Sequence, residues 1–113
     1  MTHKSRSELG LPVPICEEAA RIGANIRLAR KRRGITQAEM AERMFVTRKT
    51  LSRLEQGEVS ASIGVLLSAL WVLGLERDIM GVADPAKDAV GLQRERALLP
   101  KRVRKTLAET VDF

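Results

Sequence analysis

The sequence predicts an all-α protein with one five-helix domain and a loosely structured C-terminal tail. Its 113 residues are enough for one ordinary domain and too few for two. Hydrophobic residues make up 44% of the chain but aromatic residues only 3%, so Leu, Ile, Val, Met and Ala must form the core. Such a core favours packed helices, because strands draw on aromatic and β-branched residues. Capping residues and glycines then divide the chain into helix-sized segments.

The N-terminal third of the chain predicts a flexible arm followed by a long helix. Residues 1–14 mix small, charged and proline residues and form the expected arm. The first helix is expected from Cys16 or Glu17 to Arg33, because acidic residues at its start and arginines at its end complement the helix dipole. Gly34 is expected to end it. The spacing i, i+4, i+7 predicts a buried stripe of Ile22, Ile26 and Ala29.

Two short helices follow, each preceded by a threonine that can cap it. The hydroxyl of Thr36 can accept from the backbone N–H of Glu39, and Glu39 can reach back to complete a capping box, so a helix is expected over 37–44. Thr47 is expected to cap a third helix over 48–56, which Gly57 ends. The side chains expected to face the core are Ala38, Ala41 and Met44 on the second helix and Leu51 and Leu54 on the third.

The fourth expected helix, 63–73, is apolar around most of its circumference. A domain of this size rarely buries a helix on all sides, so one side is expected to face another subunit. Leu66, Leu70 and Leu73 are expected to close the core, which leaves as candidates for that contact Val65, Trp71 and Val72.

The remaining sequence predicts one more helix and then a tail. The fifth helix is expected over 76–82, and Asp84-Pro85 is expected to begin a looser segment that reaches Pro100. Residues 101–110 could form a short basic helix or stay flexible. The chain therefore divides into an arm (1–14), a domain (15–83) and a tail (84–113), which is a candidate segment for binding a partner or for dimerisation.

The charge of the chain is concentrated in one segment. The whole chain carries +6, whereas residues 21–57 hold ten basic and three acidic side chains, a net +7, and residues 58–92 carry −3. A basic segment beside an acidic one indicates a surface that binds a polyanion, although a solvated surface would give the same pattern.

Several classes of function lack the residues they need. A single cysteine, Cys16, and a single histidine, His3, give no disulfide and no metal-ligand spacing. The sequence contains no Gly-rich phosphate loop and no paired carboxylates. Neither enzymatic activity nor a bound cofactor is therefore expected. The sequence contains no apparent targeting signal and no run of ~18 apolar residues, so a cytoplasmic protein without a membrane span is expected.

The third expected helix has the properties of a helix that enters the major groove of DNA. Such a helix needs a polar, basic face opposite a face that packs on the domain. Leu51 and Leu54 supply the packing face, and the opposite face carries Arg48, Lys49, Ser52 and Arg53. Guanidinium groups match the O6/N7 edge of guanine. Gln37 and the first N–H groups of the second helix form a candidate phosphate site.

The order of residues across these two helices resembles the lambda-repressor-like helix-turn-helix family, the phage repressor/Cro (XRE) group. The segments that carry the resemblance are Ile35-Thr36-Gln37-Ala38-Glu39-Met40-Ala41 and Val46-Thr47-Arg48-Lys49-Thr50-Leu51-Ser52-Arg53-Leu54-Glu55-Gln56-Gly57. The resemblance covers residues 20–82 and implies a domain that binds double-stranded DNA. It implies base contacts from Thr47, Arg48, Lys49, Ser52 and Arg53, and backbone contacts from Arg30, Thr36, Gln37, Thr50 and Gln56. For Arg30, a structural ion pair with Glu55 is the alternative.

One position departs from the family. The turn between the two helices usually carries glycine where this chain has Phe45, because that residue tends to need a positive φ. A bulky side chain there costs roughly 1 kcal/mol of strain unless the turn is rearranged. Either the turn differs, or Phe45 packs on a partner.

The family resemblance also implies partners. Members usually bind palindromic operators as homodimers, with half-sites about 34 Å apart. The sequence after residue 75 is similar to the tail of HipB-like antitoxins, the repressor halves of toxin–antitoxin operons, and implies a HipA-like kinase as a second partner. Two alternatives stay open: a stand-alone XRE-type regulator, and a protein-interaction module that kept the fold without the DNA.

Overall fold

Every regular element in the computed structural model, which describes residues 10–109 and the side chains of residues 10–99, is helical. The predicted all-α fold class is therefore confirmed. The boundary between two compact units falls between Ile79 and Met80. No helix within residues 10–109 has both the length and the hydropathy needed to cross a membrane.

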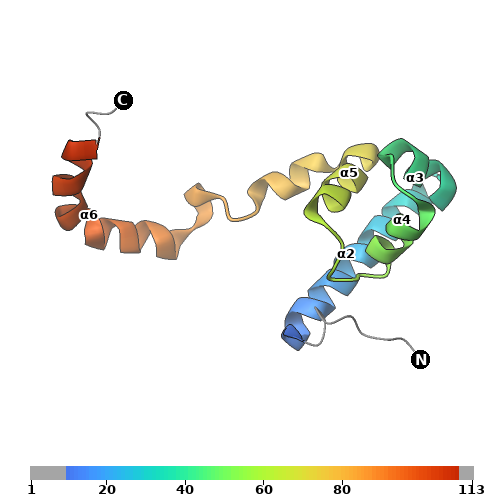
Figure 1. Ribbon diagram of the computed structural model, residues 1–113, viewed down its shortest axis with the longest axis horizontal. Coiled ribbons are helices and arrows are strands. Elements are labelled where there is room, and N and C mark those ends of the chain that lie inside the picture. Colours follow the sequence, from blue (N-terminus) through green and yellow to red (C-terminus); the bar gives the residue numbers. More distant parts are fainter. Residues whose placement is uncertain (1–9, 110–113) are drawn as a thin grey trace. The chain divides into compact units, whose positions relative to one another are not determined.

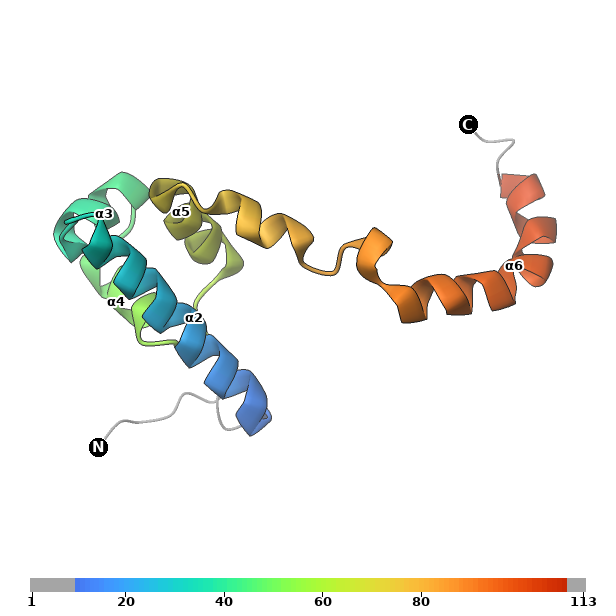
Figure 2. The same cartoon turned by 180° about the vertical axis from the view of Figure 1, so that it is seen from behind.

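From residue 13 on, the first unit contains the α-helices α2 (Val13–Arg32), α3 (Gln37–Met44), α4 (Arg48–Glu55) and α5 (Ile63–Leu73). Figures 1 and 2 show α4 and α5 beside α2, and α3 beside α4 and α5. The bounds predicted for α3 and α5 are confirmed, and α4 ends one residue earlier than expected. Helix α2 begins three residues before Cys16, with Pro12 as its cap and Pro14 in its first turn, where proline costs no hydrogen bond.

The core lies where the four helices meet. Met40 and Leu51 are fully buried at its centre. The other buried apolar side chains are Ile26, Ala41, Met44, Leu54, Ala69 and Leu73. No aromatic ring is among these buried residues, as the composition predicts. The inward positions predicted for Ala41, Met44, Leu51 and Leu54 are confirmed.

Two side chains expected in the core are exposed instead. The buried face of α3 is centred on Met40, Ala41 and Met44. Gln37 shares that face, and Ala38 is exposed because it lies about 100° around the helix from Gln37. Ile22 on α2 is 38% exposed, whereas Ile26 one turn later is buried. Between them Gly23 is buried, because α2 approaches α4 at the glycine itself.

Helix α5 buries only part of the apolar surface that its sequence provides. Leu73 is buried, and Val65, Leu66 and Val72 pack against the core. Packing on the core thus also involves Val65 and Val72, which were expected at a subunit contact. The exposed apolar residues on this helix are Ile63, Leu67 and Trp71.

After α5 the chain forms two 3₁₀ helices, η1 (Glu76–Gly81) and η2 (Pro85–Lys87), and then α6 (Ala89–Glu109). The expected fifth helix is thus the 3₁₀ element η1. The looser segment expected up to Pro100 is helical from Ala89 onward, because Asp88 Oδ1 accepts from the N–H of Gly91 at 2.9 Å and caps α6. Pro100 lies inside α6, and Figure 1 shows a bend in this helix, as expected where proline removes a backbone hydrogen bond.

Candidate nucleic-acid interface

Two threonines set the start of α3 and of α4. Thr36 and Thr47 have extended backbones, and their hydroxyls accept from the N–H of Glu39 and of Thr50, both at 3.1 Å. Both predicted caps are confirmed. The return contact at α3 differs from the capping box, because the Thr36 hydroxyl donates to Glu39 Oε1. At α4 the two hydroxyls of Thr47 and Thr50 are 2.9 Å apart.

Helix α4 separates apolar and basic side chains on opposite faces. Leu51 and Leu54 are buried, whereas Arg48, Lys49 and Arg53 are exposed. These three and Ser52 line an open depression of about 620 Å³, together with Gln37, Gln56 and Glu58. The structure therefore brings together six of the residues expected at the interface. Thr47 is exposed beside this surface at the start of α4, and Thr36 is exposed at the start of α3.

A buried ion pair fixes α4 to α2 beneath this surface. Arg30 donates to Glu55 from Nε at 2.7 Å and from Nη2 at 3.0 Å, and each residue is only 6% exposed. The third donor, Nη1, bonds the carbonyl of Ile35 at 2.9 Å. Arg30 is therefore directed into the structural pair that was the alternative to a DNA contact, and its guanidinium is not on the exposed face.

Gln37 connects the ion pair to the exposed face. Its Nε2 donates to Glu55 Oε1 at 3.0 Å, and its Oε1 accepts from Nε of Arg48 at 3.3 Å. A continuous chain of contacts thus runs from Arg30 through Glu55 and Gln37 to Arg48. This chain restricts the directions in which the Arg48 guanidinium can point, while leaving its Nη groups outside the contact.

Glu58 is an acidic residue at this surface that the sequence did not predict. Its carboxylate lies 3.6 Å from Nε of Arg53. Two backbone bonds, from Gly57 N–H to Leu54 O and from Glu58 N–H to Arg53 O, close α4 in a Schellman motif that places residue 58 beside residue 53. The predicted glycine stop at Gly57, whose φ is +76°, was the signal that could have found this contact.

The turn between α3 and α4 keeps the left-handed residue. Phe45 has φ 56° and ψ 38°, so the turn is not rearranged to avoid a positive φ. Its side chain is 96% exposed. Of the two outcomes expected for Phe45, the altered turn is therefore wrong, and contact with a partner stays a prediction.

Comparisons with known proteins agree with this geometry. Residues 21–79, more than half of the chain, match the family model described as a helix-turn-helix domain. A protein of Methanothermobacter thermautotrophicus named as an HTH-type transcriptional regulator is 53% identical over 38 residues. That match covers 34% of this chain and 55% of the relative, so it spans only about half of the relative's length. No solved structure gives a significant match.

Proposed function

The chain belongs to the helix-turn-helix domain family, and from that membership we propose that it is a transcriptional repressor that binds specific sequences in double-stranded DNA. The observation that carries the proposal is the exposed basic face of α4, with Arg48, Lys49 and Arg53 around one depression. In the proposed complex α4 lies in the major groove, as recognition helices of this motif do.

The proposed contacts fall into two groups by position. Residues of α4 and its cap reach base edges: Thr47, Arg48, Lys49, Ser52 and Arg53. Arginine is suited to guanine, since its two parallel donors match the O6 and N7 acceptors. Contacts to the phosphate backbone come from Thr36, Gln37, Thr50 and Gln56, around the starts of α3 and α4 and the end of α4. Arg30 is left out of both groups, because it is buried against Glu55.

We further propose that the protein binds as a homodimer to a palindromic operator. A two-fold dimer presents two copies of α4 to successive turns of the major groove, about 34 Å apart. Each copy then contributes its own base contacts, so a symmetric site gains the specificity of two half-sites.

The most specific form of the proposal is an autoregulating antitoxin of a HipA-like kinase. Its support is the tail resemblance after residue 75 and the apolar side chains of Val90, Leu98 and Leu99 on α6, which are exposed within the part of the chain that the structure describes. A kinase-like protein encoded by the adjacent gene should co-purify with the full chain and be lost on removal of residues 85–113. Retention after that truncation would place the kinase contact outside the tail, whereas the absence of such a neighbour favours the stand-alone regulator.

Base recognition is tested by single substitutions in α4. Arg48→Ala and Arg53→Ala should each weaken binding roughly tenfold or more, and only for sites that keep the base opposite the lost side chain. Arg27→Ala on α2 removes the same charge from an exposed position outside this surface and serves as the matched control. Gln56→Ala should weaken all sequences alike, because a phosphate contact carries no base information.

The measurement is the affinity of each variant for a panel of operator sequences at one salt concentration, since phosphate contacts make affinity salt-dependent. Equal losses on every sequence for both arginine variants would contradict base reading. No binding to any DNA would leave only a protein-interaction module with this fold.

A further inference from the structure

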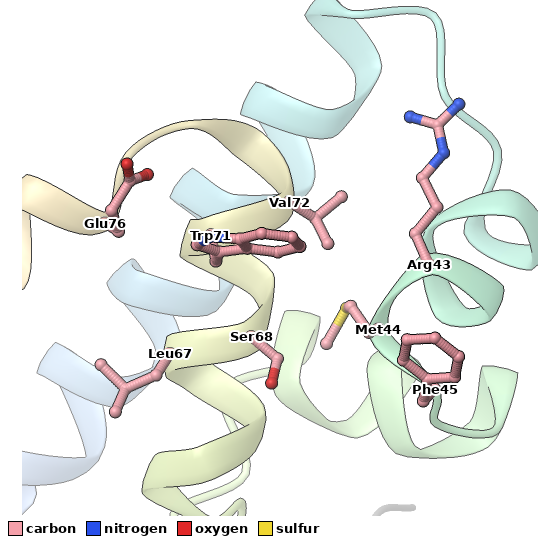
Figure 3. A pocket seen from close by; sticks show the side chains of 8 residues that line it. All are labelled: Arg43, Met44, Phe45, Leu67, Ser68, Trp71, Val72 and Glu76. Carbon is pink, nitrogen blue, oxygen red and sulfur yellow. The ribbon is translucent and has the colours of Figure 1, made fainter.

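An open apolar groove lies beside the turn between α3 and α4, on the first unit. Its volume is about 370 Å³, and Met44, Phe45, Leu67 and Trp71 supply apolar lining (Figure 3). Phe45 is 96% exposed, Trp71 is 70% exposed and Leu67 is 39% exposed. Monomeric domains rarely expose a contiguous apolar patch of large size, and such a patch marks an interaction surface.

Phe45 is the most informative of these residues. It has a left-handed backbone, which an L side chain adopts at a cost of about 1 kcal/mol or more. With 96% of its surface in solvent, its ring returns almost none of that cost within the described part of the chain. A strained and exposed aromatic residue therefore points to an interaction made outside the isolated chain.

The groove continues into an apolar stripe along α5. Ile63, Leu67 and Trp71 lie four residues apart, so they share one face of the helix. This is the face of α5 that the core does not use, because Val65, Leu66 and Val72 pack inward. The exposed surface is therefore long enough to extend beyond the groove itself.

The charges at the ends of the groove are opposite. Figure 3 shows Arg43 and Glu76 on opposite sides of Trp71. Within residues 10–99, neither side chain forms an ion pair. A two-fold axis near Trp71 would bring the Arg43 end of one copy against the Glu76 end of the other. A surface with this charge arrangement is complementary to itself, as a two-fold contact requires.

We infer that this groove is the contact surface for a second copy of this chain, with the Phe45 and Trp71 rings of two protomers packed across the axis and Arg43 of each facing Glu76 of the other. The inference rests on the proposed homodimer and names the surface that forms it. Aromatic anchors at the centre and charges at the rim are the usual arrangement of such contacts.

Charge exchange tests the two-fold arrangement directly. Arg43→Glu and Glu76→Arg should each raise the dimer dissociation constant at least several-fold, because each places like charges together. The double variant should restore the dimer. An equimolar mixture of the two single variants should also restore it, because both cross-axis pairs are then opposite in charge. Sedimentation equilibrium in the absence of DNA measures all four.

Aromatic substitutions test the centre of the contact. Trp71→Ala and Phe45→Gly should each weaken the dimer at least tenfold. Glycine suits the left-handed backbone at position 45, so loss of folding cannot explain a weaker dimer in Phe45→Gly. Leu28→Ala is the matched control, an exposed apolar residue on α2 that does not line the groove. It should leave the dimer unchanged.

Three results would overturn the inference. One is a wild-type chain that stays monomeric at about 100 µM, and another is a dimer that the aromatic variants do not weaken. The third is a mixture of the two single charge variants that does not recover the dimer. If the groove instead binds a kinase partner, Phe45→Gly should abolish binding of that partner and leave the dimer unchanged. A monomer that still binds a single half-site would leave the proposed DNA binding intact. Failure of the dimer surface and failure of DNA binding are therefore distinguishable.

Discussion

Individual side chains in this protein divide between holding the recognition helix and presenting it. The buried pair of Arg30 and Glu55 holds it, with a bidentate contact at 2.7 and 3.0 Å. Gln37 extends this support to Arg48, which is exposed. The sequence allowed both the ion pair and a DNA contact for Arg30, because only the spatial distance between α2 and α4 decides between them.

The strained backbone of Phe45 should affect the stability of the monomer. Phe45→Gly should raise the free energy of unfolding of the monomer by about 0.5–1 kcal/mol, because glycine adopts the left-handed backbone without strain and the exposed ring contributes little packing. Phe45→Ala keeps the strain and should be nearly neutral. Urea denaturation at protein concentrations below the dimer dissociation constant checks both. A less stable glycine variant there would show that Phe45 packs within its own chain.

At the scale of elements, the close approach of α2 and α4 sets the position of the recognition helix. A Cβ on Gly23 would lie 2.5 Å from the carbonyl oxygen of Leu54 and 2.6 Å from that of Glu55. A Cβ on Gly57 would collide with the backbone of Ala20. Two glycines therefore permit backbone contact between helices that the Arg30–Glu55 pair then locks.

Gly23→Ala tests this approach. The added methyl group meets backbone atoms that cannot move alone, so the substitution should lower the free energy of unfolding by about 1–3 kcal/mol. Gly64→Ala in α5 is the matched control, since its nearest neighbour would be 3.8 Å away. It should stabilise the domain by up to about 1 kcal/mol through helix propensity. Thermal or urea unfolding measures both, and a neutral Gly23→Ala would contradict the contact.

Local chemistry explains which elements the sequence predicted well. The Thr36 cap predicted next to α3 is present. The structure adds a cap at Ser62, which was not predicted from the sequence, at the start of α5. The predicted start of α2 is too late, because the prolines of residues 1–14 favoured an arm, whereas the first turn of a helix tolerates proline. For α6 the sequence allows a helix only over 101–110, because Pro100 was expected to end a looser segment, whereas it lies within the helix. The Arg53–Glu58 contact depends on the three-dimensional closure of α4 by Gly57.

At the scale of the whole molecule, the basic charge and the helix-turn-helix lie in the same segment. Residues 21–57 carry a net +7 and include α3, α4 and most of α2. Such a field attracts DNA of any sequence, and the base contacts proposed for α4 would then select among sites. The order of charged residues in the sequence located the basic segment. The arrangement of its exposed side chains around one depression could be found only from the fold.

The measurement that tests the central claim most directly is selection of bound DNA from a random pool by the full-length protein. We expect enrichment of one sequence in two inverted copies, with half-site centres about 34 Å apart or a multiple of that distance. The Arg48→Ala and Arg53→Ala variants should then each lose the preference for a different base of the half-site. A pool that shows no enriched sequence after repeated rounds would contradict specific DNA recognition by α4.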